Sequence, residues 1–143
     1  IDIPGNGVMM AIPLKSVAGG RTLGFLTDST QTGGKPAMDF SHELIMAIMN
    51  EGYSDTVMDA ARSAGAGGGT VLHAKGTGRA RAEKFFGVSL ADEKDVVYIV
   101  AHAEEKAAIM QAIADNAGPG TRAGATCFSL PISQVAGLRE RDE

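Results

Sequence analysis

Two glycine-rich segments that carry basic residues are the part of this sequence best suited to act on a ligand. Residues 65–79 read Gly-Ala-Gly-Gly-Gly-Thr-Val-Leu-His-Ala-Lys-Gly-Thr-Gly-Arg, and residues 117–124 read Ala-Gly-Pro-Gly-Thr-Arg-Ala-Gly. Glycine lets backbone N–H groups approach a ligand closely, and a guanidinium group forms paired hydrogen bonds to phosphate or carboxylate oxygens. The two segments therefore predict a binding site for a small anionic metabolite. The alternative is that both are connecting turns with solvated charges.

Neither segment matches a general nucleotide-binding motif. The P-loop needs Gly-Lys followed by Ser or Thr, and a dinucleotide fingerprint needs a preceding strand and a third glycine that Gly65-Ala-Gly67 lacks. Neither segment contains Ser or Cys beside His, so the nucleophile and base of covalent catalysis are missing. The residues therefore favour a binding protein over an enzyme. Hydrolysis or group transfer on a nucleotide or acyl phosphate is the competing hypothesis.

The composition predicts a soluble globular protein. The chain has 143 residues, of which 44% are apolar, enough for one full hydrophobic core and a second partial unit. Its net charge of −4 argues against a nucleic-acid partner bound by bulk charge. No apolar run approaches the roughly 20 residues of a membrane span, so membrane insertion is not expected. Cys127 is the only cysteine, which argues against a disulfide framework and favours a reducing, cytoplasmic setting.

Hydrophobic patterning predicts the order strand–helix–strand, strand–helix–strand. The expected strands cover residues 42–50, 70–74, 95–101 and 125–132, and the expected helices cover residues 54–64 and 104–117. This order is typical of the α+β ferredoxin-like (βαββαβ) fold, in which both helices lie on one face of an antiparallel sheet. The other face of the sheet has no cover, which predicts an oligomer.

The ends of the two helices carry recognisable signals. We expect Ser54 to be the N-cap of the first helix, Tyr53 and Met58 to form a hydrophobic staple, and Gly65 to end the helix. In the second helix, we expect the pair Glu104–Glu105 to lie in the first turn, where the helix dipole favours negative charge.

An internal similarity suggests a repeat. Residues 12–21 and 130–139 share Pro, Val, Ala, Gly and Arg in the same register, and both follow an apolar stretch. We therefore predict that residues 1–26 are a strand and tail from the end of a preceding repeat, residues 27–39 a linker, residues 40–139 the main domain and residues 140–143 a charged tail. The absence of an initial Met agrees with a fragment or a processed product. Chance similarity of two strand ends is the alternative.

Three motifs together resemble a known family. They are Gly67-Gly-Gly-Thr-Val, then Lys75-Gly-Thr-Gly-Arg79 before a long loop, and Phe128-Ser-Leu-Pro-Ile in the last strand. Over residues 42–139 the chain resembles the PII signal-transduction family of nitrogen regulators. The resemblance implies a homotrimer with an adenine nucleotide (ATP, ADP or AMP) as effector in each cleft between subunits, and no required cofactor. It also implies a mobile loop, residues 79–92, that contacts a regulated enzyme or membrane transporter.

The resemblance also implies which residues bind the nucleotide. Gly68, Gly69 and Thr70 would lie beside the adenosine, and Gly76, Gly78 and Arg79 would approach the phosphates. The second glycine-rich segment would contribute the residues Gly118, Gly120, Thr121 and Arg122, and Arg139 matches a cation of the family after the last strand.

Several positions depart from the family pattern. Residues 80–82 read Ala-Arg-Ala where the family has Gln-Lys-Gly, so metal-linked binding of 2-oxoglutarate is not expected. Thr126 stands where Lys is usual, which points to low ATP affinity or to another nucleotide. His42, His73 and His102 are far apart in the sequence and are expected to be strand-end histidines rather than metal ligands. A structural trimer that binds a metal or a small anion such as bicarbonate is the alternative function.

Overall fold

The computed structural model describes residues 7–14, 40–77, 84–85, 88–89 and 92–138. Within these residues the elements, in chain order, are β1 (Met9–Ala11), β2 (His42–Asn50), α2 (Ser54–Ser63), β3 (Thr70–Gly76), β4 (Lys84–Phe85), β5 (Val88–Ser89), β6 (Asp92–His102), α3 (Lys106–Ala117), β7 (Thr126–Ile132) and β8 (Gln134–Ala136). The four predicted strands and two predicted helices are all present. β3 and β6 are longer than the sequence pattern predicts, and β8 was not predicted.

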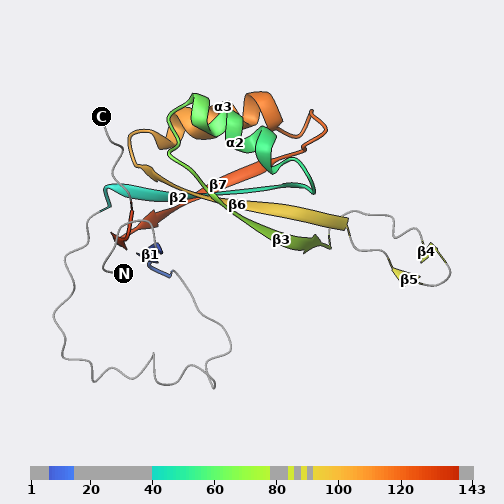
Figure 1. The fold of residues 1–143 in the computed structure, drawn as a ribbon, viewed down its shortest axis with the longest axis horizontal. Helices are drawn as coiled ribbons and strands as arrows, with labels where there is room; N and C mark the ends of the chain where they lie inside the picture. The colour runs from blue at the N-terminus through green and yellow to red at the C-terminus, as the bar shows by residue number, and fades with distance from the viewer. Residues whose placement is uncertain (1–6, 15–39, 78–83, 86–87, 90–91, 139–143) are drawn as a thin grey trace, which may run out of the picture.

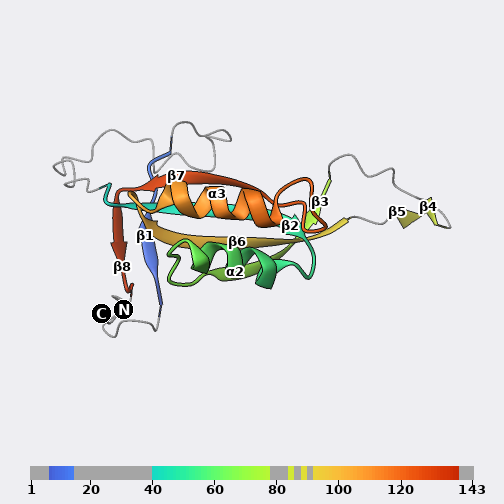
Figure 2. The same cartoon turned by 90° about the horizontal axis from the view of Figure 1, so that it is seen from above.

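The main sheet has the strand order β3-β6-β2-β7, and every neighbouring pair is antiparallel. Both helices cover the same face of this sheet (Figures 1 and 2). The predicted α+β ferredoxin-like fold is therefore confirmed.

The hydrophobic core lies between the sheet and the two helices. Strand alternation places Ile45, Ala47 and Met49 of β2 on the helix-covered face, and all three are buried. The helices contribute Val57, Met58 and Ala61 from α2 and Ile109 and Ile113 from α3.

The start of α2 differs from the prediction, and its end agrees. Tyr53 is the N-cap and Ser54 is already helical, because the Val57 N–H donates to the Tyr53 carbonyl at 3.1 Å; no side chain caps this end. The predicted Ser54 cap is therefore wrong, and Tyr53 does not stand at the position before the cap that a staple needs. At the other end, Gly65 has a φ of 108°, and the two cap hydrogen bonds of a Schellman motif are present.

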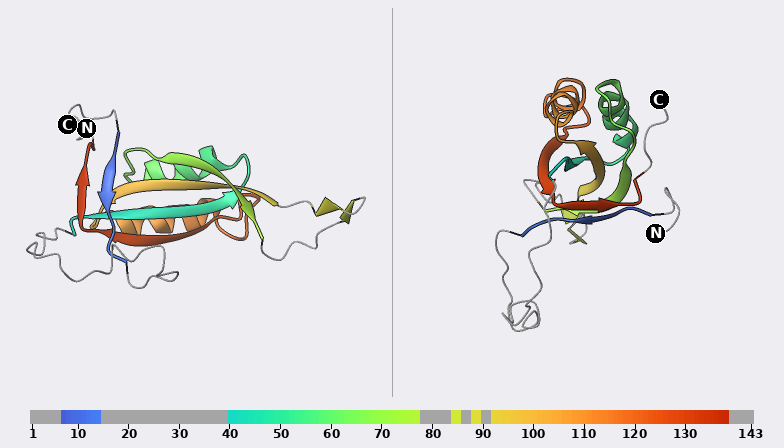
Figure 3. Two further views of the ribbon diagram at one scale, coloured as in Figure 1. Left: turned by 90° about the horizontal axis from the view of Figure 1, so that it is seen from below. Right: turned by 90° about the vertical axis from the view of Figure 1, so that its left-hand side faces the viewer.

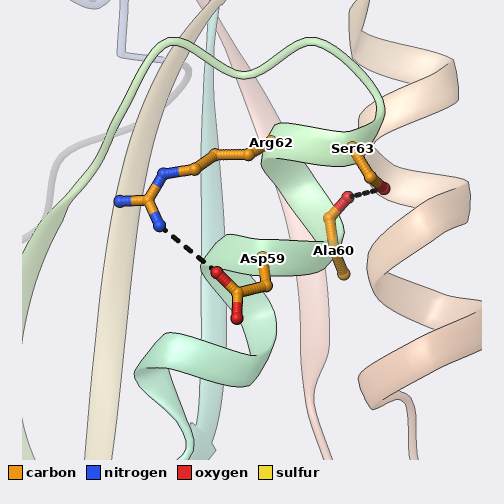
Figure 4. Close-up of polar contacts among 4 residues, drawn as sticks. All are labelled: Asp59, Ala60, Arg62 and Ser63. Atoms are coloured by element: carbon orange, nitrogen blue, oxygen red, sulfur yellow. Dashed lines mark hydrogen bonds and ion pairs between the residues drawn. The ribbon is translucent and has the colours of Figure 1, made fainter.

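Polar contacts on the last turns of α2 are local. Arg62 Nη1 donates to Asp59 Oδ1 at 3.4 Å, and Ser63 Oγ donates to the Ala60 carbonyl at 2.7 Å (Figure 4). Both side chains of the ion pair are exposed, so this pair contributes little to stability.

α3 begins later than predicted. It starts at Lys106, and Glu104 and Glu105 precede it in a turn whose hydrogen bond runs from the Glu105 N–H to the His102 carbonyl at 3.0 Å. The acidic pair is therefore not in the first helical turn. Lys106 instead donates to Glu43 Oε1 of β2 at 3.1 Å, which joins the helix to the sheet. The helix ends at Gly118, as predicted.

No helix covers the second face of the main sheet (Figure 3). In register, Met46 of β2 lies between Tyr98 of β6 and Phe128 of β7. Ile48 is 38% exposed and Phe128 is 41% exposed. The expected open apolar face is therefore present around Ile48 and Phe128, whereas Leu44 and Ile132 on the same face are buried.

β1 forms a separate two-stranded sheet with β8, with Met10 opposite Val135. This sheet lies across the end of the main sheet at which β2 begins (Figure 2). The predicted division into residues 1–26, 27–39, 40–139 and 140–143 stays a prediction; most of the first two segments and nearly all of the last lie outside the described residues. None of the helices in the described part of the chain is long and apolar enough to span a membrane.

Candidate functional site

The strand register brings the two glycine-rich segments to one end of the main sheet. Gly76, the last residue of β3, pairs with Asp92, the first residue of β6. β2 ends at Asn50 at the same end, and β7 begins there, with Thr126 opposite Ile48. The segment after β3 and the segment before β7 therefore leave and join the sheet at the same end.

Asn50 connects this end of the sheet to the second glycine-rich segment. Its side-chain amide donates to the Arg122 carbonyl at 2.9 Å, and its backbone N–H donates to the Ala123 carbonyl at 2.9 Å. Lys94 Nζ donates to Asn50 Oδ1 at 2.6 Å. The backbone of the second segment is thus fixed to β2, and β2 is joined to β6 by a charged side chain.

Because Gly76 has no side chain, there is room beside it for the Lys94 side chain. A Cβ at position 76 would lie 3.1 Å from Lys94 Cε and 3.3 Å from Lys94 Cγ, tighter than ordinary van der Waals contact. Because glycine leaves this space empty, the Lys94 stem passes over the end of β3 while its ammonium group reaches Asn50. Gly76 therefore has a packing role at the site, whether or not it contacts a ligand.

In the second glycine-rich segment, two of the predicted binding residues serve the turn itself. The Thr121 hydroxyl and N–H both donate to the Gly118 carbonyl, at 2.8 and 3.0 Å. A Cβ on Gly118 would overlap the Ala114 carbonyl oxygen, so this position needs glycine for the chain to leave α3. Gly120 has open space around it, and Arg122 is exposed. Pro119 and Thr121 are exposed as well, so residues 119–122 of this turn all face solvent.

The residues predicted to lie beside the adenosine are at a different place in the same chain. Thr70 begins β3 and Gly76 ends it, and at about 3.3 Å per residue this separates them by about 20 Å. A Cβ on Gly69 would lie 2.8 Å from Met58 Sδ and 2.9 Å from Val97 Cγ1, whereas Gly68 has open space. Within one chain, the structure therefore brings Gly76 to the end that holds residues 118–122, and leaves residues 68–70 apart.

Part of the predicted site and loop falls outside the described residues. Gly78, Arg79 and Arg139 belong to this part. Of the predicted loop, the described residues form the short strands β4 and β5, which pair with each other. Asp92 belongs to β6 rather than to the loop, because its ladder partner is Gly76.

Residues 42–142 match the family model described as nitrogen regulatory protein P-II. The chain belongs to the P-II family. A solved structure of Arabidopsis thaliana PII bound to citrate has a TM-score of 0.52 and 18% sequence identity, and the match covers 73% of this chain and 97% of that chain. A functionally unknown protein from Pediococcus pentosaceus has a TM-score of 0.48 and 17% identity, over 67% of this chain and 96% of that chain. No curated protein matches this sequence.

The family match confirms the resemblance inferred from the motifs, and the Arabidopsis structure supports the fold. P-II proteins are regulators, as the family's description states. β1 precedes the part of the chain that matches the P-II family, yet it pairs with β8, which lies inside it.

This P-II domain also contains a buried carboxylate that the sequence did not single out. Asp95 is 2% exposed and is the one buried polar or charged residue found among those described. The Gly52 N–H donates to Asp95 Oδ2 at 2.9 Å, and His73 Nδ1 lies 2.8 Å from Asp95 Oδ1. The Gly52 hydrogen bond lowers the pKa of Asp95 most, His73 lowers it further, and burial acts in the opposite direction. Asp95 is two residues from Val97 and four from Ile99 in β6, so all three side chains lie on the same face of the strand. This spacing was a signal in the sequence that Asp95 faces the core.

The histidines of the P-II domain are not all isolated. His42 and His102 are opposite each other in the β2–β6 ladder, and their ring centroids lie 4.6 Å apart. His42 begins β2 and His102 ends β6, as expected of strand-end histidines, but the sequence analysis did not predict that these two lie side by side. The signal was available in the sequence, because the first residue of one strand and a residue at the end of another can meet when the strands pair antiparallel.

Proposed function

We propose that this P-II protein is a non-enzymatic regulator that binds a small anionic metabolite where its two glycine-rich segments meet. An adenine nucleotide, ATP, ADP or AMP, is the leading ligand. The observation that carries the proposal is the chain of contacts from Gly76 through Lys94 and Asn50 to the backbone of Arg122. These contacts join the end of β3, next to the exposed Lys75, to the turn that carries the exposed Arg122.

The charge at this end of the sheet favours directed hydrogen bonds over bulk attraction. Lys75, Lys94 and Arg122 supply positive charge, but Asp92 and Glu93 are exposed beside them. A ligand is therefore not drawn in by net potential. It is recognised by donors in fixed positions, of which a guanidinium group and the N–H groups of a glycine-rich turn are the strongest for phosphate oxygens.

The distance between the parts of the predicted site supports a homotrimer. Residues 68–70 lie about 20 Å from Gly76 in one chain, so a nucleotide that touches both groups must lie between two copies. The open apolar face around Met46, Ile48 and Phe128 gives copies of the chain a surface to bury. In this proposal the contact between copies completes each cleft.

The proposed output is the predicted loop that begins at residue 79, with its end corrected to residue 91 because Asp92 belongs to β6. Because Gly76 and Asp92 are paired, the two ends of the loop are held side by side at the proposed binding site. A ligand there that binds one loop conformation more tightly than another shifts the balance between them. The loop would thereby control contact with an enzyme or a membrane transporter.

Calorimetry with ATP, ADP and AMP tests this proposal. We expect Arg122→Ala to weaken binding of the best nucleotide by about 1.5–3 kcal/mol, or roughly 10- to 150-fold, as for loss of a charged hydrogen bond. Arg62→Ala is the matched control, because Arg62 is exposed on α2 and pairs with Asp59. Citrate is a second ligand to titrate, since the Arabidopsis PII structure is described as bound to it.

The outcomes separate the parts of the proposal. No binding of any nucleotide at millimolar concentration rejects a nucleotide sensor, and equal affinity of the two arginine variants removes Arg122 from the site. Turnover of ATP by the pure protein would favour the enzyme hypothesis instead. Analytical ultracentrifugation tests the trimer, and we expect Ile48→Glu to shift the protein toward monomer because it places a charge on the open face.

A further inference from the structure

His42 and His102 form a pair at the end of the sheet opposite the glycine-rich segments. His42 is the first residue of β2, His102 is the last residue of β6, and the two are ladder partners. Their imidazole rings are 4.6 Å apart between centroids and tilted by 35°. Since directly opposed residues of antiparallel strands project to the same side, both rings lie on the sheet face that carries Met46 and Ile48.

We propose that this histidine pair binds a divalent transition-metal ion, with Ni²⁺ or Cu²⁺ preferred. A metal bound to an imidazole nitrogen at about 2.1 Å lies about 3.2 Å from the ring centroid. Two centroids 4.6 Å apart then make an angle of about 90° at the metal. A tetrahedral angle would need centroids about 5.2 Å apart, so the spacing fits neighbouring positions of a square-planar or octahedral ion better than tetrahedral Zn²⁺.

The surroundings of His42 set which of its nitrogens is free for the metal. Ser41 Oγ lies 2.9 Å from His42 Nδ1. With a metal on Nε2, Nδ1 carries the proton and donates it to the Ser41 hydroxyl, the arrangement in which a second partner orients a metal-binding histidine. His102 is exposed, so its ring can turn to present a nitrogen without disturbing the core.

The site is open rather than closed. The described part of the chain contains no group of three or more His, Cys, Asp or Glu side chains able to hold a metal together. The described residues thus supply two imidazole ligands, and the proposed ion keeps other coordination positions for water. Because the two ligands come from different strands, the bound ion links the start of β2 to the end of β6 and stabilises the folded chain over the unfolded one.

Titration of the full chain with NiCl₂, in a buffer free of citrate and nucleotide, tests the site. We expect one ion per chain and, at free Ni²⁺ of about five times Kd, a rise in melting temperature of about 4–8 °C. His42→Gln and His102→Gln should each remove both effects, while circular dichroism checks that each variant is folded. His73→Gln is the control, since His73 has an exposed ring and lies against Asp95 instead of another histidine.

Electron paramagnetic resonance with Cu²⁺ counts the ligands directly. Wild type and His73→Gln should show coupling to two imidazole nitrogens, and each variant of the pair should show one or none. Wild-type affinity in either single variant of the pair, or equal loss in His73→Gln, overturns the proposal. Neither result depends on nucleotide binding, so the metal site and the proposed regulatory function can fail separately.

Discussion

Substitution of two adjacent glycines distinguishes packing from ligand binding in the P-II domain. Gly68 and Gly69 were both predicted to lie beside the adenosine, but their surroundings differ. A Cβ on Gly69 would meet Met58 Sδ at 2.8 Å, Val97 Cγ1 at 2.9 Å and the Tyr98 carbonyl oxygen at 3.1 Å, whereas a Cβ on Gly68 meets nothing within 4 Å. Gly69→Ala should therefore destabilise the fold, and Gly68→Ala should not.

The size of the effect follows from which neighbours can move. The Met58 side chain is flexible and can give way, but Val97 is fully buried in the central strand β6 and the Tyr98 carbonyl is backbone. Relief therefore requires β3 to separate from β6 near Thr70. Overpacking of this kind costs about 1–3 kcal/mol, which for a domain of about 100 residues lowers the melting temperature by roughly 4–8 °C per kcal/mol.

Urea denaturation followed by circular dichroism measures the difference at one protein concentration. Both variants make the same change in the unfolded chain, so comparing them isolates the folded state. We expect Gly68→Ala to lie within about 0.5 kcal/mol of wild type. If Gly69→Ala is as stable as Gly68→Ala, the packing argument is wrong. If Gly68→Ala weakens nucleotide binding without loss of stability, position 68 has the binding role that the family resemblance implies.

Two other substitutions test the interpretation of the fold. Asp95→Asn should destabilise the protein at neutral pH, because it removes the charge that the Gly52 N–H stabilises. Since folding lowers the pKa of Asp95, the contribution of this carboxylate is present above its unfolded pKa and is lost as pH falls through the folded value; urea denaturation from pH 7 to pH 3 should show the wild-type advantage shrinking. Gly118→Ala should cost about 1–3 kcal/mol, because its Cβ would overlap the Ala114 carbonyl oxygen, whereas Gly120→Ala, in open space, should be neutral in the same assay.

Local sequence patterns predicted the helices and strands because buried side chains recur at short intervals, every second residue in a strand and every third or fourth residue in a helix. The alternation of Ile45, Ala47 and Met49 fixes one face of β2, and the spacing of Ile109 and Ile113 fixes one face of α3. Gly65 was predicted to end α2 because a left-handed residue is needed there, and its φ of 108° confirms this.

Helix starts were predicted less well, because several residues near each start have similar cap preferences. Ser54 is a good cap residue, but the first backbone hydrogen bond of α2 goes to Tyr53. Glu104 and Glu105 suit a first helical turn, but the turn after His102 delays α3 until Lys106. In both cases the geometry of the preceding turn decided where the helix begins. The local sequence pattern carries no information on that turn geometry.

Contacts between distant residues were the part that local patterns could not supply. The pairs His42–His102 and His73–Asp95 each depend on strand register, which follows from the whole sheet rather than from either strand. The separate roles of Gly68 and Gly69 likewise depend on α2 and β6 packing against one of them. The motifs pointed correctly to the P-II family, but the different surroundings of Gly68 and Gly69 became visible only in the packing.

The two proposed ligand sites lie at opposite ends of one strand. β6 begins at Asp92, at the base of the loop, and ends at His102, so at about 3.4 Å per residue the sites are about 34 Å apart. Between them, Val97 and Ile99 are fully buried, and β6 pairs with β2 over residues 94–102 and with β3 over residues 92–98. A strand that is packed in this way has a single conformation. Coupling between distant sites requires a structural element that can adopt two conformations. The metal site and the anion site should therefore bind independently within one chain, and any coupling between them would have to arise from the contacts between copies.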